Sequence, residues 1–343
     1  MNKNRPPTMA DVAKAAGVSP MTVSRALRPN TSASKETRAR ILEAAEALGY
    51  VLDSTASGLS SRHSGFVAMT IPSINNTNFS DTLRGLSDGL KETGLDLLLG
   101  YTNYDIDEEE RVVRSLLRRR PEAIVVTGGN HTEQCRKYLS ASGVPVIETW
   151  DLPDDPIGHV VGFSNAQAGE LVAQHFYDQG LRKIGFIGGH TLRDTRGFAR
   201  RTGFLNALKR LGLEDHRVAD TGVPPTTIAR GAKGFADLLE RHPDTQAVMC
   251  VSDPVAFGAL MECQRRGIEV PSQMAIAGFG DDDISESCYP NITTVEVGPF
   301  DIGMQTAQII QAALDETSEF TPIRSLKSEC QLRIRQSSDL KNV

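Results

Sequence analysis

Apolar positions in the first fifty residues follow a helical period in three short segments. Residues 9–16 and 20–26 are separated by Gly17, which suits a left-handed turn between two closely crossing helices. Residues 34–48 form a third amphipathic segment that ends at Gly49. The positions predicted to form the small core are Val12, Ala13, Ala16, Val18 and Val23, with Ile41, Leu42, Ala45 and Leu48 on the third helix. This spacing predicts a small all-α domain that contains a helix-turn-helix.

The second of these helices has a clear start and an unusual outer face. Ser19 serves as its N-cap, and Pro20 stands in its first turn, where a missing N–H costs nothing. The outer face presents Pro20, Met21, Thr22, Ser24 and Arg25. A short helix with an arginine on its outer face fits the DNA major groove. We therefore predict a DNA-binding head; the alternative is an ordinary two-helix hairpin in a small domain.

From Phe66 onward, strand-like and helix-like patterns alternate. Short apolar runs typical of buried strands occupy 66–71, 95–101, 123–127, 145–150, 183–188, 247–251 and 275–279. Amphipathic segments lie between them, at 79–93, 107–119, 132–142, 166–179, 196–211, 228–241 and 254–266. A further helix over 300–314 and a strand near 325–333 complete the set. This alternation predicts parallel sheets with helices on both faces.

The strand and helix pattern divides into two sets near residue 160. We therefore predict an α/β body of two doubly wound parallel-sheet lobes, with a ligand cleft at the carboxyl ends of the strands. The predicted organisation is a head over 1–50, a Ser-rich join over 51–64, and a body over 65–343 whose crossovers lie near 160 and within 295–325.

Charge supports this division. The 343 residues include 37 Lys and Arg and 43 Asp and Glu, a net charge of −6. Residues 1–62 carry a net charge of +4, and the remainder carries −10. A basic head on an acidic body concentrates phosphate attraction at one end of the molecule. Ordinary scatter of surface charge is the alternative explanation.

Several function classes lack their sequence signals. The five cysteines are scattered without a C-x-x-C pair, as in proteins with reduced thiols. We find no signal-peptide-like start and no apolar run of 18 residues, so we expect a cytoplasmic protein that does not enter a membrane. Metal-ligand spacings, nucleotide-binding loops and nucleophile elbows are also absent from the sequence, so we expect no metal, no cofactor and no catalytic residues. A secreted sugar-binding protein and an architectural DNA-binding protein are the other classes considered.

Longer motifs carry a family resemblance. The head contains Asp11-Val-Ala-x-x-Ala-Gly-Val-Ser-x-x-Thr-Val-Ser-Arg, followed by Gly49-Tyr50. The body contains Gly180, Arg200-x-x-Gly203-Phe204, Asp253-x-x-Ala256-x-Gly258, Val270-Pro271 and Ala277-Gly278-Phe279. On these motifs the chain resembles the lactose-repressor/galactose-repressor (LacI/GalR) family of bacterial transcription regulators, whose body is periplasmic-binding-protein-like. Within the family it looks most like the gluconate repressors, through Met21-Thr22-Val23-Ser24-Arg25, Ile71-Pro72-Ser73, Glu262-Cys263-Gln264-Arg265 and Met274-Ala275-Ile276-Ala277-Gly278-Phe279.

The resemblance implies a homodimer that presents two heads to a pseudopalindromic operator in double-stranded DNA. By position, Pro20, Met21 and Arg25 would face the bases, and Ser19, Thr22 and Ser24 would hold phosphates. The join would become a hinge helix on DNA. In that hinge, Ala56 and Leu59 match the family pattern, and Leu59 would insert into a minor-groove step.

The resemblance also implies a small-molecule effector, a sugar or sugar acid, bound between the lobes. The positions that match effector contacts are Phe79, Trp150, Asp151, Phe163, Arg196, Arg200, Ser252, Asp253 and Asp281. Arg196 and Arg200 are four residues apart on one helix, so they share a face, and arginine suits a planar carboxylate. Gluconate or a similar aldonate is therefore the first choice. The alternative is a neutral sugar, with both arginines paired to Asp194 or to residues 281–283.

Overall fold

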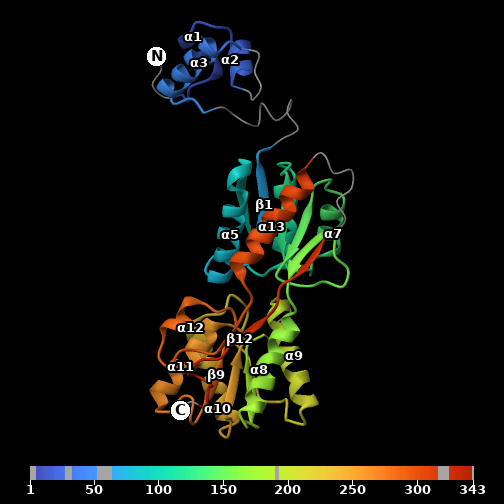
Figure 1. Ribbon diagram of the computed structural model, residues 1–343, viewed down its shortest axis with the longest axis vertical. Coiled ribbons are helices and arrows are strands. Elements are labelled where there is room, and N and C mark those ends of the chain that lie inside the picture. The colour runs from blue at the N-terminus through green and yellow to red at the C-terminus, as the bar shows by residue number, and fades with distance from the viewer. Residues whose placement is uncertain (1–4, 28–32, 52–63, 190–192, 316–323, 342–343) are drawn as a thin grey trace. The chain divides into compact units, whose positions relative to one another are not determined.

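The computed structural model describes residues 5–27, 33–51, 64–189, 193–315 and 324–341, which form two compact units, 1–64 and 65–343 (Figure 1). The first unit contains helices α1 (Met9–Ala16), α2 (Pro20–Ala26) and α3 (Lys35–Leu48). Gly17 ends α1 with a φ of 65°, which is the left-handed turn expected between the first two helices. No helix within the described ranges is long and apolar enough to cross a lipid bilayer.

The core of the first unit is small and local. Its buried members are Val12, Ala13, Ala16, Val23, Ala26, Ile41 and Ala45. The prediction for Leu42 was wrong, because its side chain is 47% exposed. Ile41 and Leu42 are neighbours about 100° apart around the helix axis, and α3 packs on α1 and α2 through a narrow face that includes Ile41 and Ala45 but not Leu42.

The second unit consists of two lobes, each with a parallel sheet. The N-terminal lobe has the strand order β11-β5-β4-β3-β1-β2, and the C-terminal lobe has the order β7-β6-β8-β9. Its N-terminal lobe comprises β1 (Phe66–Ile71), α5 (Thr77–Leu90), the 3-10 helix η1 (Lys91–Thr93), β2 (Asp96–Tyr101), α6 (Ile106–Leu117), β3 (Ala123–Thr127), α7 (Glu133–Ser140), β4 (Val146–Thr149), β5 (His159–Gly162), α13 (Pro299–Leu314) and β11 (Ser325–Lys327).

The C-terminal lobe is assembled in the same way. It comprises α8 (Asn165–Asp178), β6 (Ile184–Ile187), α9 (Thr195–Arg210), β7 (Val218–Ala219), α10 (Ile228–Arg241), β8 (Ala247–Cys250), α11 (Asp253–Arg266), β9 (Ala275–Ala277) and α12 (Asp283–Ser287), with β10 (Thr294–Glu296) and β12 (Gln331–Arg333) forming an antiparallel pair beside it.

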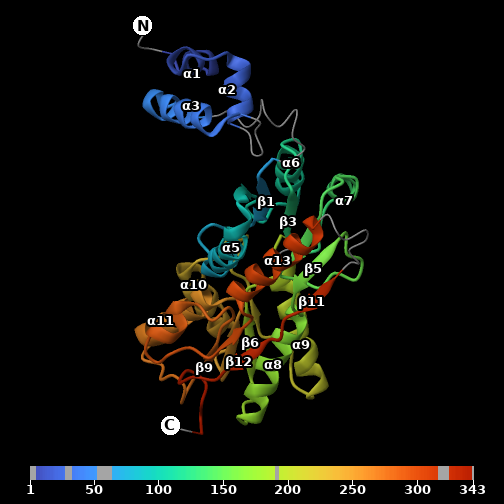
Figure 2. The same cartoon turned by 45° about the horizontal axis from the view of Figure 1, so that its top comes forward.

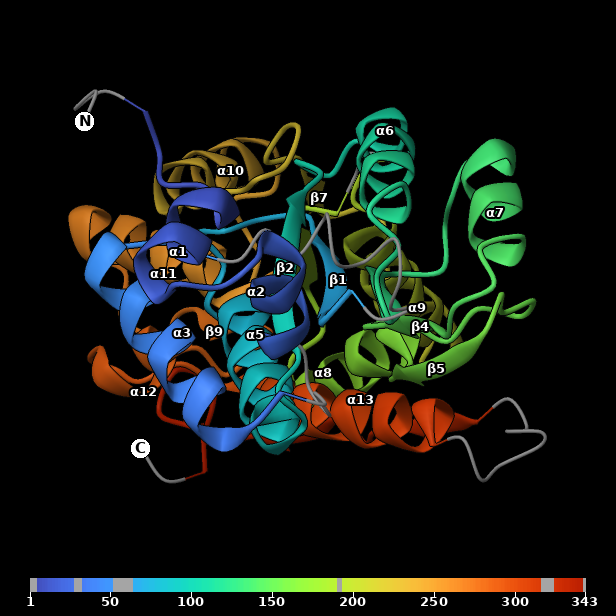
Figure 3. The same cartoon turned by 90° about the horizontal axis from the view of Figure 1, so that it is seen from above.

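Helices cover both faces of each sheet, as the alternating pattern predicts. In the N-terminal lobe, α5 packs with α13 and α6 packs with α7, on opposite sides of β1 (Figure 3). In the C-terminal lobe, α8 packs with α9 and α10 packs with α11. Gly203 allows the closest approach of α8 and α9, because a Cβ on it would lie 2.1 Å from the carbonyl oxygen of Ala166.

Three crossings join the lobes in the part of the chain that the structure describes. They lie between β5 and α8, between β10 and α13, and between β11 and β12 (Figure 2). The predicted single strand near 325–333 is wrong, because β11 extends the N-terminal sheet beside β5 whereas β12 pairs with β10. The third crossing therefore lies beyond the predicted 295–325 range. The sequence pattern also missed the short elements β5, β7, β10 and α12.

Candidate nucleic-acid interface and ligand cleft

Helix α2 presents the residues that the sequence placed on its outer face. Its N-cap is Ser19, whose Oγ accepts a hydrogen bond of 3.2 Å from the Thr22 N–H. Pro20, Met21 and Arg25 are exposed, and Thr22 and Ser24 are half-buried. The opposite face, with Val23 and Ala26, is buried against α1 and α3.

The guanidinium of Arg25 has no hydrogen bond or ion pair with any residue that the structure describes. Ala56 and Leu59, the predicted hinge residues, lie outside the described residues.

A cleft lies between the two lobes of the second unit. We call it the interlobe cleft. Its lining residues are Asn76, Asn78, Phe79, Tyr104, Trp150, Asp194, Arg196, Arg200, Thr226, Val251, Ser252 and Phe279. Each of these residues lies in or just after a loop that follows a parallel strand, so both sheets direct their carboxyl ends into the cleft. Five predicted effector residues are among them: Phe79, Trp150, Arg196, Arg200 and Ser252.

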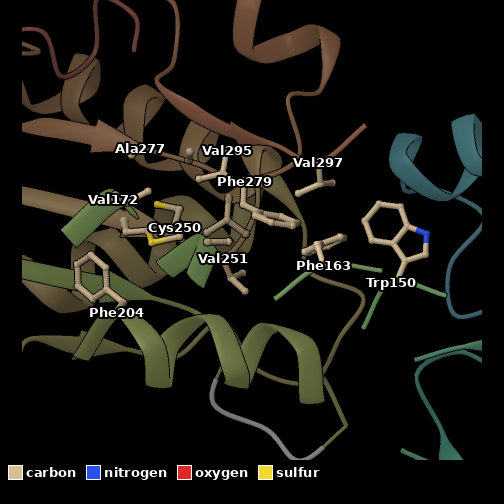
Figure 4. Packing of buried hydrophobic residues seen from close by; sticks show 14 of the residues in the cluster. Trp150, Phe163, Val172, Phe204, Cys250, Val251, Ala277, Phe279, Val295 and Val297 are labelled. Carbon is tan, nitrogen blue, oxygen red and sulfur yellow. The ribbon is translucent and has the colours of Figure 1, made fainter. Parts of the chain in front are cut away.

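Trp150 closes one side of the interlobe cleft from a strained position. Its φ of 70° lies in the left-handed region, which is rare for a large side chain. The indole N–H donates to Thr82 Oγ1 at 3.2 Å, and the ring packs edge-on against Phe79 and Phe163 at centroid distances of 5.0 and 5.6 Å. Figure 4 shows Trp150 and Phe163 near Phe279, which joins the cores of the two lobes.

Four predicted effector residues do not line the interlobe cleft. Phe163 is fully buried between Trp150 and Phe279. Asp151 accepts a hydrogen bond of 3.0 Å from the Leu152 N–H. Asp281 forms an ion pair of 2.7 Å with Arg335. These groups are already occupied by the protein, which the sequence pattern could not indicate.

Asp253 is the fourth of these residues, and it lies beneath the lining of the interlobe cleft. It is completely buried, and it accepts hydrogen bonds from Thr294 Oγ1 at 2.7 Å and from the Asp282 N–H at 2.8 Å. Burial, together with the nearby Asp282 carboxylate, raises the pKa of this carboxyl to about 7. Asp253 therefore fixes the loop that contains residues 280–282.

The two predicted arginines lie side by side on α9, with exposures of 8% and 7%. Arg196 Nη1 donates to the carbonyl oxygen of Thr127 at 3.2 Å, across the lobes. Arg200 Nη1 donates to Asn165 Oδ1 at 2.5 Å, and its guanidinium lies 3.9 Å from the Phe279 ring centroid. The Nε of Arg200 has no hydrogen-bond partner among the described residues, and burial lowers the pKa of this side chain.

Neither arginine pairs with the carboxylates that a neutral-sugar site would offer it. Asp194 caps α9 by accepting from the Gly197 N–H at 3.0 Å, and Asp282 accepts from Thr77 Oγ1 at 2.6 Å and Asn78 Nδ2 at 2.7 Å. Within the described ranges, the interlobe cleft thus contains two buried guanidiniums without an ion pair.

The sequence reasoning missed seven lining residues: Asn76, Asn78, Tyr104, Asp194, Thr226, Val251 and Phe279. Asn76 is the N-cap of α5, and its Oδ1 accepts from the Asn78 N–H at 3.0 Å. Burial raises the pKa of Tyr104 to about 12, so this hydroxyl is a hydrogen-bond donor at neutral pH. Asn76, Asn78, Tyr104 and Asp194 follow predicted strands, and Val251 and Phe279 are the last residues of two more, so a place at or after a strand end was the signal that could have found these six. Thr226 follows β7, which the sequence pattern missed.

Comparison with known proteins agrees with the geometry. Residues 8–53 match the family model of bacterial regulatory proteins, lacI family, and residues 173–338 match that of the periplasmic binding protein-like domain. The chain is 36% identical to the HTH-type transcriptional regulator GntR of Pseudomonas aeruginosa, over 90% of this chain and 89% of that protein. It is 32% identical to the HTH-type transcriptional regulator IdnR of Escherichia coli, over 90% and 92%.

A crystal structure supports the same conclusion about the fold. A LacI-family transcriptional regulator from Silicibacter pomeroyi superposes with a TM-score of 0.90 and 33% identity, over 97% of this chain and 99% of that one. The predicted fold class, a small helix-turn-helix head with a periplasmic-binding-protein-like α/β body, is confirmed.

Proposed function

The chain belongs to the lacI family of bacterial regulatory proteins and is a DNA-binding transcriptional regulator, and we propose that it is a repressor controlled by gluconate or a related sugar acid. The observation that carries the effector proposal is the pair of buried arginines in the interlobe cleft. Burying a guanidinium without an ion pair is costly even with the Asp194 carboxylate nearby, and an anionic ligand would pair with it directly. Arg200 also offers an unused Nε donor, and a guanidinium binds a planar carboxylate in a bidentate way.

The rest of the interlobe cleft suits the hydroxyl groups of an aldonate. Asn76, Asp194 and Thr226 supply amide, carboxylate and hydroxyl groups, and Tyr104 supplies a further donor. Phe79 and Trp150 supply aromatic surface for the C–H groups of the chain. The lining contains more polar and charged side chains than apolar ones, which suits a hydroxyl-rich anion better than an apolar ligand.

The head supplies the DNA-binding half of the proposal. We assign base contacts to Pro20, Met21 and Arg25, and phosphate contacts to Ser19, Thr22 and Ser24. A homodimer would place two copies of α2 in successive major grooves of a pseudopalindromic operator, and Arg25 would bind a guanine edge. Ala56 and Leu59 keep their proposed role in a minor-groove hinge. The proposal includes no catalysis and places the protein with its operator in the cytoplasm.

Effector control would act as a population shift between two arrangements of the lobes. The equilibrium moves only by the difference in effector affinity between the two states. Contacts that cross the cleft distinguish these states. They include the hydrogen bonds from Thr77 and Asn78 to Asp282 and the ion pair between Arg193 and Asp105. An effector that changes the lobe angle would rearrange these contacts and misplace the hinge.

Calorimetric titration of the purified protein with gluconate tests this proposal, with galactose and ribose as neutral controls. We expect saturable binding of gluconate alone, and a loss of about 2 kcal/mol, or roughly thirtyfold, in Arg196→Gln and Arg200→Gln. Arg210→Gln is the matched control, because Arg210 is on the same helix but is exposed and paired with Glu170. Binding of galactose or ribose without gluconate binding would favour the neutral-sugar alternative. The regulatory proposal would fail if no ligand that binds the interlobe cleft changed the affinity of the protein for its operator.

A further inference from the structure

A second set of ionisable side chains lies away from the interlobe cleft, on the α6 and α7 side of the N-terminal sheet. Glu109 comes from α6, His131 from the loop after β3, Cys135 from the first turn of α7, and Glu148 from β4. We call these four residues the buried polar cluster. The side chains of His131 and Glu148 are 0% and 1% exposed, and Cys135 is fully buried.

The donor atoms of three of these residues lie close together. One ligand atom each from Glu109, His131 and Cys135 lies within 4.8 Å of the other two. His131 Nδ1 is 2.8 Å from Glu109 Oε2, and His131 Nε2 is 3.7 Å from Glu148 Oε1. These last two atoms have no hydrogen-bond partner in the described part of the chain.

Glu148 is held so that its free oxygen faces His131. Its other oxygen, Oε2, accepts from the Ile157 N–H at 2.6 Å and from the Gly158 N–H at 3.4 Å. The carboxylate is thereby anchored on one side and left unsatisfied on the other. A buried polar atom without a partner is uncommon and calls for an explanation.

The apolar surroundings of the buried polar cluster raise the free energy of burying its charged groups. Its neighbours form an apolar group: Val112, Val113, Leu116, Ile124, Val126, Leu139 and Val146. Two carboxylates beside a single imidazole leave excess negative charge in this apolar environment, which costs free energy. A bound divalent cation would place two positive charges among these groups.

We propose that Glu109, His131 and Cys135 bind one divalent transition metal ion of the zinc class, with Glu148 as the carboxylate that orients His131. Thiolate, imidazole and carboxylate are the ligands that zinc takes in proteins, whereas magnesium and calcium prefer oxygen alone. A ligating histidine commonly donates its other ring N–H to a carboxylate, and Glu148 Oε1 is the acceptor available at Nε2.

Protons and charge balance in this site. The metal takes His131 through Nδ1, which gives up the proton it shares with Glu109, and Cys135 loses its thiol proton. The two positive charges of the metal are then matched by the Cys135 thiolate and the Glu109 carboxylate, and the Glu148 carboxylate keeps its charge and accepts from the remaining N–H of His131. Metal binding therefore releases protons and becomes tighter as the pH rises.

The sequence predicted no metal site because the ligands are not arranged as a short motif. Glu109 and His131 are 22 residues apart in the sequence. Only His131 and Cys135 are close in the sequence, at a spacing of four residues. The parallel sheet brings them together. The site would tie α6 to α7 and fix the loop after Thr127, the residue whose carbonyl oxygen accepts from Arg196.

Loading the full-length protein with Co²⁺ and Zn²⁺ after chelator treatment tests the proposal. We expect one Co²⁺ to bind per chain and to give a thiolate-to-cobalt charge-transfer absorption. Adding Zn²⁺ should displace the Co²⁺ and abolish this absorption. Cys135→Ser should lose this absorption, His131→Gln should lose stoichiometric binding, and Glu148→Gln should weaken Zn²⁺ binding by about tenfold or more.

Two controls separate this site from surface binding. Cys288→Ser removes a different thiol, and His216→Asn disrupts a pair with His242, whose ring centroid lies 5.1 Å from that of His216. Both controls should bind as wild type does. The proposal is overturned if metal is removed by simple dialysis, if binding is lost in His216→Asn, or if wild type bound to Co²⁺ lacks the charge-transfer absorption. This last result decides the question even if Cys135→Ser fails to fold.

Discussion

The DNA-contact helix and the interlobe cleft are built in opposite ways. The proposed DNA contacts of α2 all lie within the seven positions from Ser19 to Arg25, and the hydrogen bond that caps the helix joins residues three apart. The cleft draws on segments from Asn76 to Phe279, and the bond between Asn78 and Asp282 spans 204 residues. The outer face of α2 is exposed, whereas both cleft arginines are buried.

This difference predicts different costs of mutation. An exposed side chain on α2 can change without disturbing the packing beneath it, so affinity for DNA and stability should separate. Residues around the interlobe cleft belong to the same core that holds the lobes together, so ligand affinity and stability should change together.

Asp253→Asn, at the back of the interlobe cleft, should have the largest effect, which is on how the free energy of unfolding depends on pH. Because burial raises the pKa of Asp253 to about 7 from its usual 3.8, the folded state keeps a proton that the unfolded chain loses between these values. The free energy of unfolding should therefore fall as pH rises from about 4 to 7, by roughly 4 kcal/mol from this group. Asparagine stays neutral, so the variant should lose this part of the slope. Denaturant unfolding at several pH values measures it.

An asparagine can keep both hydrogen bonds at this position, because its oxygen can accept from the Asp282 N–H and its amide can donate to Thr294 Oγ1. Asp301→Asn is the matched control at an exposed carboxyl. Burial also raises the pKa of Asp282, so the slope in the variant should shrink without vanishing. An unchanged slope in Asp253→Asn would show that the folded state does not hold this proton.

Gly203→Ala is the next largest expected effect. Its Cβ would overlap the carbonyl oxygen of Ala166, so α8 and α9 must separate, at a cost of about 3 kcal/mol. Because α9 carries Arg196 and Arg200, ligand affinity should fall as well. Gly212→Ala is the control: Gly212 has a φ of 73° and open space around it, so only backbone strain of about 1 kcal/mol is expected. Equal losses in the two variants would rule out the overlap as the cause.

The same contrast explains how much could be predicted from sequence. The head was predicted well because its signals are local: Ser19 and Gly17 fix the ends of helices by their own chemistry. The alternation of strands and helices was also visible, because parallel strands are apolar on both faces. Leu42 shows the limit even there, since only tertiary packing decides which apolar side of α3 is covered.

The interlobe cleft was predicted only in part because its geometry depends on distant partners. Asp281 pairs with Arg335, and Asp253 is covered by Thr294; neither partner is near in sequence. Strand β11 is exposed along its length and has no apolar pattern, yet it pairs with β5 at the sheet edge. Such pairings follow from topology rather than from the residues of one segment.

The smallest expected effect, in Ser19→Ala and Ser34→Ala, makes the sharpest test of the head. Each serine Oγ accepts from an N–H three residues later, at 3.2 Å, and so caps α2 or α3. Each alanine should cost about 1 kcal/mol of local stability. Hydrogen exchange in residues 9–48 of the full-length protein should accelerate about fivefold in both variants.

Operator binding should then distinguish the two caps. Ser19 is also a proposed phosphate contact, so Ser19→Ala should lose a further fivefold or so in operator affinity that Ser34→Ala retains. Because the structural cost is matched, the difference between the variants isolates the contact with DNA. Equal losses of operator affinity would mean that Ser19 acts only as a helix cap, and that the register of α2 on the phosphate backbone is set by Thr22 and Ser24.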